Sequence, residues 1–341
     1  MMRPHLVVLS RAGRASIDAR CWAELEEHAK VTVVRRDQAP DHSTACRLLA
    51  DADLMGATNL CLPKMDAALL DRLPRLRGIV LYATGYDHLD VAQLRARGVG
   101  LSILPEYATI AVAEHAVALL LALATRLHLA HDRSRGAVSA GASLRGMELA
   151  GKTVGIVGVG RIGSHVARLS RGIGMTVAGT DIDPCAVSRA EAAGVVMGSL
   201  DWLVEHCDAL IVCASHEFAA PPIVRRRELV RLRTGALLVN VSRSALVDTA
   251  AAVQAVRSGQ LRGYAVDDTV LDVARDGDLL TEGRILQTGH SAWWRDEVLR
   301  RGARMWGERL LAAVRGLPLD AVTWTTEDCR RSPVVAPTRI C

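Results

Sequence analysis

The chain has 341 residues, of which half are apolar and 23% are charged, so it is long enough for two domains with substantial cores. The net charge is +5, but acidic residues lie between the arginines and the basic run at residues 225–227 has no aromatic neighbours, which argues against nucleic-acid binding. The eight cysteines lack metal-like spacing and no apolar stretch is long enough for a bilayer. We therefore expect a cytoplasmic protein without a metal centre or membrane span.

The first hundred residues alternate short apolar runs with helical segments. Helices are predicted at Ile17–Lys30 and Met65–Leu73. Strands alternating with helices indicate a parallel sheet that is covered on both faces. The predicted strands are Leu6–Leu9, Val31–Val34, Leu54–Gly56, Gly78–Leu81 and Gly100–Ile103.

A long helix rich in Ala and Leu is predicted from about Ile110 to Asp132, apolar nearly all round and therefore buried. A loop follows, and then a second alternating series begins near residue 151. An amphipathic helix from Trp294 to about Arg315 closes this series. The strands predicted in it are Thr153–Val157, Thr176–Thr180, Ala209–Cys213, Leu237–Val241, Gly263–Val266 and Arg284–Gln287.

A glycine-rich turn separates the strand predicted at residues 153–157 from a helix. Gly158, Gly160 and Gly163 form the pattern G-x-G-x-x-G. The first glycine permits a tight turn, the second lets the backbone approach a pyrophosphate, and the third permits close packing of helix on strand. The helix N-terminus then supplies N–H donors to the phosphates. The pattern predicts a dinucleotide site.

Asp181 ends the next predicted strand, and 181 − 163 places it 18 residues after Gly163. An acidic side chain at about this distance binds the ribose hydroxyls of the adenosine. Its charge would repel the 2′-phosphate of NADP, and no arginine follows it directly. The predicted cofactor is therefore NAD.

Three further segments follow in order, namely Asn240–Asp248, Gly263–Asp272 and Gln287–Trp294. Together with the glycine-rich turn and with Thr84–Asp90 and Val112–His115 upstream, they closely resemble the D-isomer-specific 2-hydroxyacid dehydrogenase family. The resemblance covers nearly the whole chain, and motif order and spacing are intact. It implies an oxidoreductase that transfers a hydride between NAD and a small 2-oxo or 2-hydroxy acid.

The resemblance assigns each chemical task of this reaction to a residue. Arg243 would hold the substrate carboxylate and polarise the ketone, because its guanidinium offers paired donors. His290 would protonate the developing alkoxide. Asp272 would orient this histidine and keep it charged.

The other implied site residues form two groups. The substrate would lie against Thr84, Gly85, Arg243 and Trp293. The cofactor would lie against Gly158, Gly160, Arg161, Ile162, Gly163, Asp181, Ser242 and Asp267.

Four departures from the family pattern concern the substrate. Asp272 replaces the usual glutamate, Ser244 replaces a glycine, and Gly289 replaces a proline. The usual Pro-Leu-Thr signature gives way to residues 214–222, a segment expected near the cofactor. These departures affect the expected turnover rate and the identity of the substrate, which stays open, more than they affect the class of reaction.

Two other functions compete with this one. Trp293 is also similar to the partner-binding region of the C-terminal binding protein corepressors, which would make the chain an NAD(H)-sensing regulator, but the long extension of such regulators is missing. Formate dehydrogenases carry Gln in place of Asp272, and phosphite dehydrogenases carry Lys within the segment Tyr82–Gly85, so both are disfavoured.

The family architecture is α/β, with two Rossmann-like, doubly wound parallel-sheet domains and a cleft between them. By resemblance, the substrate domain comprises residues 1–104 plus 293–341, and the NAD-binding domain, residues 105–292, is inserted. The helix at 110–132 is expected to take part in a homodimer formed through the NAD-binding domain.

Overall fold

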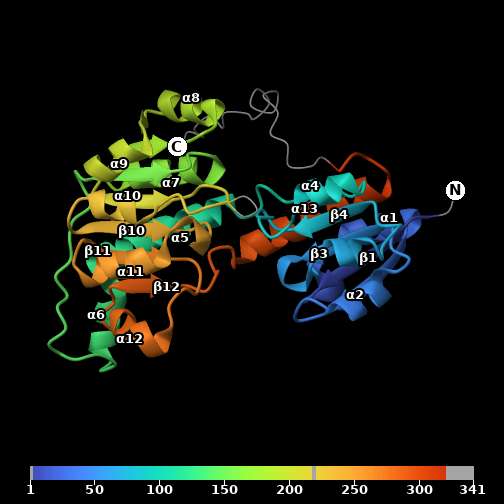
Figure 1. Cartoon of the computed structure of the whole chain (residues 1–341), viewed down its shortest axis with the longest axis horizontal. Coiled ribbons are helices and arrows are strands. Elements are labelled where there is room, and N and C mark those ends of the chain that lie inside the picture. The colour runs from blue at the N-terminus through green and yellow to red at the C-terminus, as the bar shows by residue number, and fades with distance from the viewer. Residues whose placement is uncertain (1–2, 217–219, 320–341) are drawn as a thin grey trace. The chain divides into compact units, whose positions relative to one another are not determined.

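The computed structural model describes residues 3–216 and 220–319, which form two compact units (Figure 1). The first holds the described residues of Met1–Ala83, Leu89–Leu104 and Gly302–Cys341. The second holds Thr84–His88 and the described residues of Pro105–Arg301. Every residue that the sequence assigned to the functional site lies in the second unit.

The first unit contains a five-stranded parallel sheet, in the order β2-β1-β3-β4-β5. All five predicted strands are confirmed: β1 (His5–Ser10), β2 (Lys30–Arg35), β3 (Leu54–Thr58), β4 (Gly78–Tyr82) and β5 (Gly100–Ser102). The connecting helices are α1 (Trp22–His28), α2 (His42–Leu49), α3 (Ala67–Leu70) and α4 (Val91–Ala96).

Two of these helices are shorter than predicted. The chain from Ile17 enters α1 through a 3₁₀ turn, Ala19–Cys21, in which the Asp18 carboxylate accepts a hydrogen bond from the Arg20 N–H. Asp66 likewise caps α3 by accepting a hydrogen bond from the Leu69 N–H, so this helix begins two residues after Met65. In both cases an aspartate favours a cap over the helix interior, a local preference that the apolar spacing does not reveal.

The core of the first unit is built around Trp306, on the C-terminal helix α13 (Asp296–Val314). Trp306 is fully buried and donates a hydrogen bond from its indole N–H to the Val80 carbonyl oxygen at 3.0 Å. Its ring meets Tyr82 edge to face at a centroid distance of 5.3 Å. A Cβ at Gly56 would approach the indole to 3.2 Å, so the glycine leaves room for it.

The second unit contains a seven-stranded parallel sheet in the order β12-β11-β10-β9-β6-β7-β8. The six predicted strands are confirmed, and β8, a two-residue edge strand with Val196 about half exposed, was not predicted. The bounds are β6 (Thr153–Val157), β7 (Thr176–Thr180), β8 (Val196–Met197), β9 (Ala209–Val212), β10 (Ala236–Asn240), β11 (Leu261–Val266) and β12 (Ile285–Gln287).

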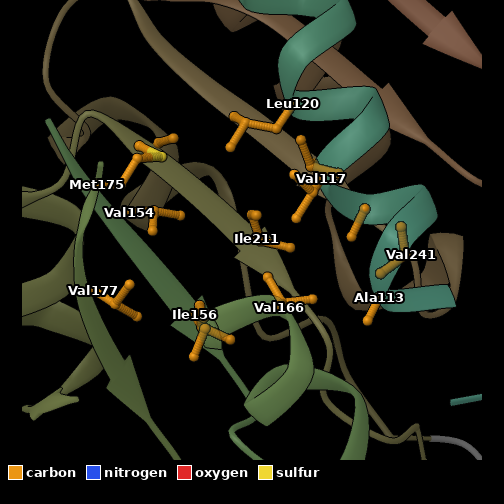
Figure 2. Close-up of a cluster of buried hydrophobic side chains, with 14 of the residues drawn as sticks. Ala113, Val117, Leu120, Val154, Ile156, Val166, Met175, Val177, Ile211 and Val241 are labelled. Carbon is orange, nitrogen blue, oxygen red and sulfur yellow. The ribbon is translucent and has the colours of Figure 1, made fainter. Parts of the chain in front are cut away.

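Helices cover both faces of this sheet, as continuous apolar strands require. On one face α5 (Thr109–Thr125) and α7 (Arg161–Gly172) pack on the strands, and Figure 2 shows side chains of α5 such as Val117 facing Ile211 of β9. On the other face lie α9 (Leu200–His206), α10 (Arg226–Arg231) and α11 (Thr249–Arg257). The sheet is therefore doubly wound, with its topological switch between β6 and β9.

The long helix predicted at 110–132 is two helices, which corrects that expectation. Arg126 adopts a left-handed conformation with φ 56°, which ends α5, and α6 (Leu127–Ser134) leaves at a bend of 61°. Within the described ranges, no single helix is long and apolar enough to cross a membrane; only this bent pair reaches the required length and composition.

Candidate active site

Apart from Thr84 and Gly85, which follow β4, the predicted site residues follow strands at one edge of the seven-stranded sheet. Parallel strands end at the same edge, and open α/β sheets bind ligands beyond the carboxyl ends of their strands. Gly158 follows β6, Asp181 follows β7, Arg243 comes shortly after β10, and Asp267 follows β11. The segment Thr288–His290 follows β12. The topology therefore gathers segments that are far apart in sequence.

The glycine-rich turn has the geometry that a bound dinucleotide needs. Gly158 has a φ of 89°, and a Cβ there would lie 2.6 Å from the Ala214 backbone nitrogen. A Cβ at Gly163 would lie 2.0 Å from the Gly158 carbonyl oxygen. Gly160 instead faces open space at the start of α7, where no side chain caps the helix. The first turn of α7 therefore offers backbone N–H groups to a phosphate.

The Asp181 carboxylate is fixed beside this turn. One oxygen accepts a hydrogen bond from the Val159 N–H at 2.8 Å, and the other accepts one from the Asp183 N–H at 3.0 Å. Each carboxylate oxygen keeps a further lone pair for a hydroxyl donor. The side chain is half-buried, whereas Ile182 beside it is almost wholly exposed. This arrangement fits the ribose hydroxyls of NAD.

Three other predicted cofactor residues lie near the same edge with different contacts. Burial lowers the pKa of Arg161, whose Nε lies 3.5 Å from a Glu106 carboxylate oxygen. Ile162 packs its side chain against the hydrophobic core. Ser242 donates its backbone N–H to the Asn240 side-chain oxygen at 3.0 Å.

Arg243 is held in a turn that Asn240 closes. The buried Asn240 amide donates to the Arg243 carbonyl oxygen at 2.8 Å. The guanidinium lies across the loop of Thr84 and Gly85, because a Cβ at Gly85 would come within 1.8 Å of Nη2. Its Nε donates to the Asp87 carboxylate at 2.9 Å. The structure thus brings Arg243 together with the two loop residues predicted to bind the substrate.

The charge on Asp87 is maintained by its neighbours. Burial alone would raise the pKa of this carboxyl, but the Arg243 guanidinium and the backbone N–H of Asp87 outweigh burial and hold the pKa below its ordinary value. Asp87 is therefore ionised at neutral pH. An ionised carboxylate with a hydrogen bond to Nε fixes the plane of the guanidinium.

Asp267 anchors the loop that carries His290. Its side chain is buried and accepts hydrogen bonds from the Thr288 hydroxyl at 2.7 Å and from the N–H groups of Ser291 and Ala292 at 2.8 and 3.1 Å. These partners lie on both sides of His290 in the chain. Asp267 therefore fixes the backbone on either side of the predicted proton donor.

A directed chain of hydrogen bonds extends from this anchor. The Thr288 hydroxyl lies 3.0 Å from Nε2 of His115, and Nη2 of Arg295 lies 3.3 Å from its Nδ1. The arginine can only donate, so Nδ1 accepts, and Nε2 donates to Thr288, which in turn donates to Asp267. Burial, more than the neighbouring Asp267 and Arg295, sets the pKa of His115 and holds it below its ordinary value of 6.5.

His290 and Asp272 are placed differently from Arg243. His290 is exposed, with a left-handed φ of 60°, and follows Gly289 in the same conformation. Asp272 is exposed and caps α12 (Val273–Thr281) by accepting a hydrogen bond from the Ala274 N–H at 3.0 Å. Within residues 3–216 and 220–319, no hydrogen bond or ion pair joins Asp272 to His290. The structure therefore brings these two residues to the same edge but does not pair them.

Trp293 is half-buried and meets Trp294 edge to face at a centroid distance of 4.9 Å. Trp294 is 60% exposed. Trp293 comes directly after Ser291 and Ala292, whose backbone N–H groups are bonded to Asp267. Its indole packs against the more exposed indole of Trp294.

Three residues of the site were not predicted. Asp87 lies in the same motif as Thr84 and Gly85. Because these two residues were predicted to lie beside Arg243, an acidic residue two positions after Gly85 could have been predicted to pair with that arginine. His115 lies on α5, a helix made almost entirely of apolar residues. Its sequence pattern predicts burial and does not reveal that this one side chain makes polar contacts. His216 lies in the unusual segment 214–222, of which residues 217–219 are outside the described residues.

Known proteins are similar to this chain over most of its length. The family model for the NAD binding domain of D-isomer specific 2-hydroxyacid dehydrogenases matches residues 117–292. A glyoxylate reductase of Thermococcus kodakarensis is 30% identical over 273 residues, which cover 78% of this chain and 80% of that enzyme. A glyoxylate reductase of Korarchaeum cryptofilum is 29% identical over 92% of this chain and 94% of its own length.

Solved structures agree with this relationship. The D-lactate dehydrogenase of Aquifex aeolicus, solved with NAD and lactic acid, superposes with a TM-score of 0.75 at 25% identity, covering 91% of this chain and 96% of that one. With the family model and the geometry of the glycine-rich turn, it supports NAD as the cofactor. The chain belongs to the D-isomer specific 2-hydroxyacid dehydrogenase family, a family of NAD-dependent oxidoreductases that act on CH–OH groups.

Proposed function

We propose that the enzyme uses NADH to reduce a small 2-oxo acid to the D-2-hydroxy acid, with Arg243 as the residue that binds the substrate. The observation that carries this proposal is the guanidinium of Arg243 lying over Gly85 and fixed through Nε by Asp87. A planar cation beside a glycine backbone is suited to a carboxylate, because both the guanidinium and backbone N–H groups can donate to its oxygens.

The free donors of Arg243 define where the substrate would bind. Its Nε is used by Asp87, and Nη1 donates to the Ser242 carbonyl oxygen at 3.1 Å. A guanidinium has five N–H groups, so donors on Nη1 and Nη2 stay available for the carboxylate and the ketone oxygen. The positive charge would also stabilise the oxygen as it becomes an alkoxide.

When bound, NADH would supply a hydride for the carbonyl carbon, and His290 would donate the proton to the carbonyl oxygen. We propose Asp272 as the carboxylate that pairs with His290. In this structure Asp272 caps α12, so pairing requires it to exchange the Ala274 N–H for the imidazole. Contacts of this kind often tighten only in the substrate complex.

The test is oxidation of NADH in the presence of glyoxylate, hydroxypyruvate, phenylpyruvate and a 2-oxo acid that bears a phosphonate. The relatives named glyoxylate reductase make glyoxylate the first substrate to try. We expect turnover with at least one member of the panel, and chiral analysis should identify the D-product. No turnover with any member, despite tight binding of NADH, would refute the proposal and favour an NAD(H)-sensing regulator.

The role of His290 has its own test. His290→Ala should lower kcat by about a hundredfold or more while the dissociation constant of NADH stays unchanged, because a positioned acid contributes at least about this much. His28 of α1 serves as the matched control, since it is a partly exposed histidine in the first unit. If His290→Ala and His28→Ala have the same turnover, His290 is not the acid.

We further propose a cytoplasmic homodimer. Five of the described cysteines are free thiols, which suits a reducing compartment: Cys21, Cys46, Cys61, Cys207 and Cys213. Ile110 and Leu121 of α5 and Leu127 of α6 are exposed apolar residues on the NAD-binding unit, which supports a dimer formed through this region. We also propose that the substrate domain comprises residues 1–104 plus 293–341 and that the NAD-binding domain comprises residues 105–292. Light scattering of wild type and Leu121→Glu tests the dimer, which the charged residue should dissociate.

A further inference from the structure

His216 is a buried histidine that the proposed reaction does not yet use. It follows β9 in the segment that departs from the family pattern. This segment passes close to the dinucleotide turn, because a Cβ at Gly158 would lie 2.6 Å from the Ala214 backbone. Its side chain is only 10% exposed. A histidine so enclosed needs partners for both ring nitrogens.

Both ring nitrogens of His216 face oxygen atoms. Nε2 lies 3.2 Å from the Ala220 carbonyl oxygen. Nδ1 lies 3.6 Å from an Asp87 carboxylate oxygen, which is ion-pair range but longer than a hydrogen bond. The second oxygen of the same carboxylate accepts the hydrogen bond from Nε of Arg243. Asp87 therefore lies between the imidazole and the substrate-binding arginine.

The partners determine which nitrogen carries a proton. A carbonyl oxygen only accepts, so Nε2 must be protonated to bond with Ala220. A neutral ring then turns the bare lone pair of Nδ1 toward the Asp87 carboxylate, and two acceptors repel each other. Nδ1 is buried and has no hydrogen-bond partner among the described residues. A second proton on the ring replaces this repulsion by an ion pair.

Three titratable or charged groups lie on the Nδ1 side of His216. Asp87 is ionised, for the reasons given above, and it faces Nδ1 directly. Arg243 lies on the far side of the carboxylate, and His88 follows Asp87 in the chain. Burial, opposed by Asp87, lowers the pKa of His88, so His88 is neutral at neutral pH and does not compete for the carboxylate.

We infer that His216 is a positioning residue of the active site, which holds Asp87 from the side opposite Arg243 and so fixes the guanidinium that binds the substrate carboxylate. The inference rests on the proposed role of Arg243. A carboxylate held by one partner can rotate about its Cβ–Cγ bond and take the arginine with it. A carboxylate that is held at both oxygens cannot rotate in this way. His216 acts through Asp87 and does not itself touch the substrate.

The kinetic test compares His216→Leu with His216→Gln. The leucine keeps the volume but not the polar contact, so KM for the 2-oxo acid should rise about five- to tenfold, as expected for one lost charge-assisted contact. The kcat and the dissociation constant of NADH should not change. The glutamine can donate to Asp87 and should recover most of the loss. His28→Leu, a matched change far along the chain, should leave all three quantities as in wild type.

Two kinetic outcomes would overturn the inference. An unchanged KM in His216→Leu means that Asp87 needs no second partner. A loss of kcat with an unchanged KM means that the imidazole handles a proton in the reaction itself, which is a different role.

A second measurement does not depend on turnover. In protein with ¹⁵N-labelled histidines, the His216 resonances are assigned by their loss in His216→Gln. Because Nδ1 faces the Asp87 carboxylate, we expect its chemical shift to differ clearly between wild type and Asp87→Asn. The same Nδ1 shift in both proteins would refute the contact. If the contact is present but no 2-oxo acid is reduced, the proposed function fails while the pairing of His216 with Asp87 stands.

Discussion

Two regions at the same edge of the sheet differ in the burial and the hydrogen bonding of their carboxylates. Asp267, after β11, is buried and holds the backbone on both sides of His290. Asp272, five residues later, is exposed and only caps a helix. We call the first the anchored region (Asn240, Arg243, Asp267, Thr288) and the second the exposed region (Asp272, Gly289, His290). Groups that fix geometry are buried and bonded, whereas groups proposed to move a proton are exposed.

The largest effect should come from the anchored region, at Arg243. Arg243→Gln removes the charge and most donors, and we expect kcat/KM for the 2-oxo acid to fall by about a thousandfold, near the upper end for loss of a group that stabilises a developing oxyanion. NADH binding, measured by fluorescence titration, should change little.

Arg304→Gln is the matched control, because Arg304 is exposed and its nearest acidic oxygen, on Glu308, is 3.9 Å away. It should behave as wild type. A loss in Arg243→Gln of less than about tenfold would mean that a different cation binds the carboxylate, since one transition-state contact to a charged group is worth more than this.

The second prediction tests the anchor itself. In Asp267→Asn an amide N–H₂ group must face N–H donors of the His290 loop, which leaves at least one buried donor unpaired. We expect the free energy of unfolding to fall by about 2 kcal/mol. The kcat should fall about tenfold or more, because the loop that carries His290 loses its fixed backbone. Urea unfolding and steady-state kinetics measure the two effects.

Asp208→Asn gives the comparison for this change. Asp208 also accepts a backbone hydrogen bond, from the Thr153 N–H at 2.9 Å, but at the opposite edge of the sheet. It should lose stability without losing kcat. If Asp267→Asn likewise loses only stability, Asp267 supports the fold and not the geometry of His290.

Most of the fold was predictable because it depends on local patterns. Buried parallel strands are continuous apolar runs, and every predicted strand is present. The errors have local physical causes. Arg126 ends a helix by adopting a left-handed conformation, and the sequence gives no sign of this because the residue is not a glycine. The strand β8 lies at the edge of its sheet, where Val196 is about half exposed.

The site was predictable where backbone chemistry dictates the residue. Gly158 and Gly163 leave no room for a Cβ, so their spacing alone identifies the turn. The contact of Arg243 with Asp87 joins residues 156 positions apart and has no sequence period. The pairing of His290 with Asp272 follows from family resemblance, whereas the observed hydrogen bond of Asp272 is with its own helix. Side-chain partners across the chain are what a single sequence does not specify.

The third prediction concerns the pH dependence of His115, whose Nε2 contacts the Thr288 hydroxyl of the anchored region. The pKa of His115 in the folded chain lies below its ordinary value of 6.5, so the unfolded chain takes up a proton first as the pH falls. Stability is therefore lost as the pH falls below 6.5. Burial also lowers the pKa values of His88 and His165, so only the difference from a variant isolates His115.

His115→Gln removes this titration but keeps a donor for Thr288. We expect the variant to be less stable than wild type at about pH 7.5 and the difference to shrink by about pH 5.5, on either side of an ordinary histidine pKa. Urea unfolding at both pH values measures it. A difference that does not depend on pH would mean that His115 is not held neutral by the fold.

The smallest effect should come from the exposed region, at Asp272. A glutamate is one methylene longer and a poorer helix cap, so Asp272→Glu should lower stability by about 0.5–1 kcal/mol. The longer carboxylate is also released from Ala274 and can reach farther toward His290, so kcat should rise about two- to fivefold if their pairing supports proton transfer.

Asp248→Glu is the control, because Asp248 caps α11 in the same way, by accepting from the Ala251 N–H at 3.0 Å. It should lose similar stability without a gain in kcat. If Asp272→Ala keeps the kcat of wild type, the exposed carboxylate serves only its helix, and His290 works without a partner at this position.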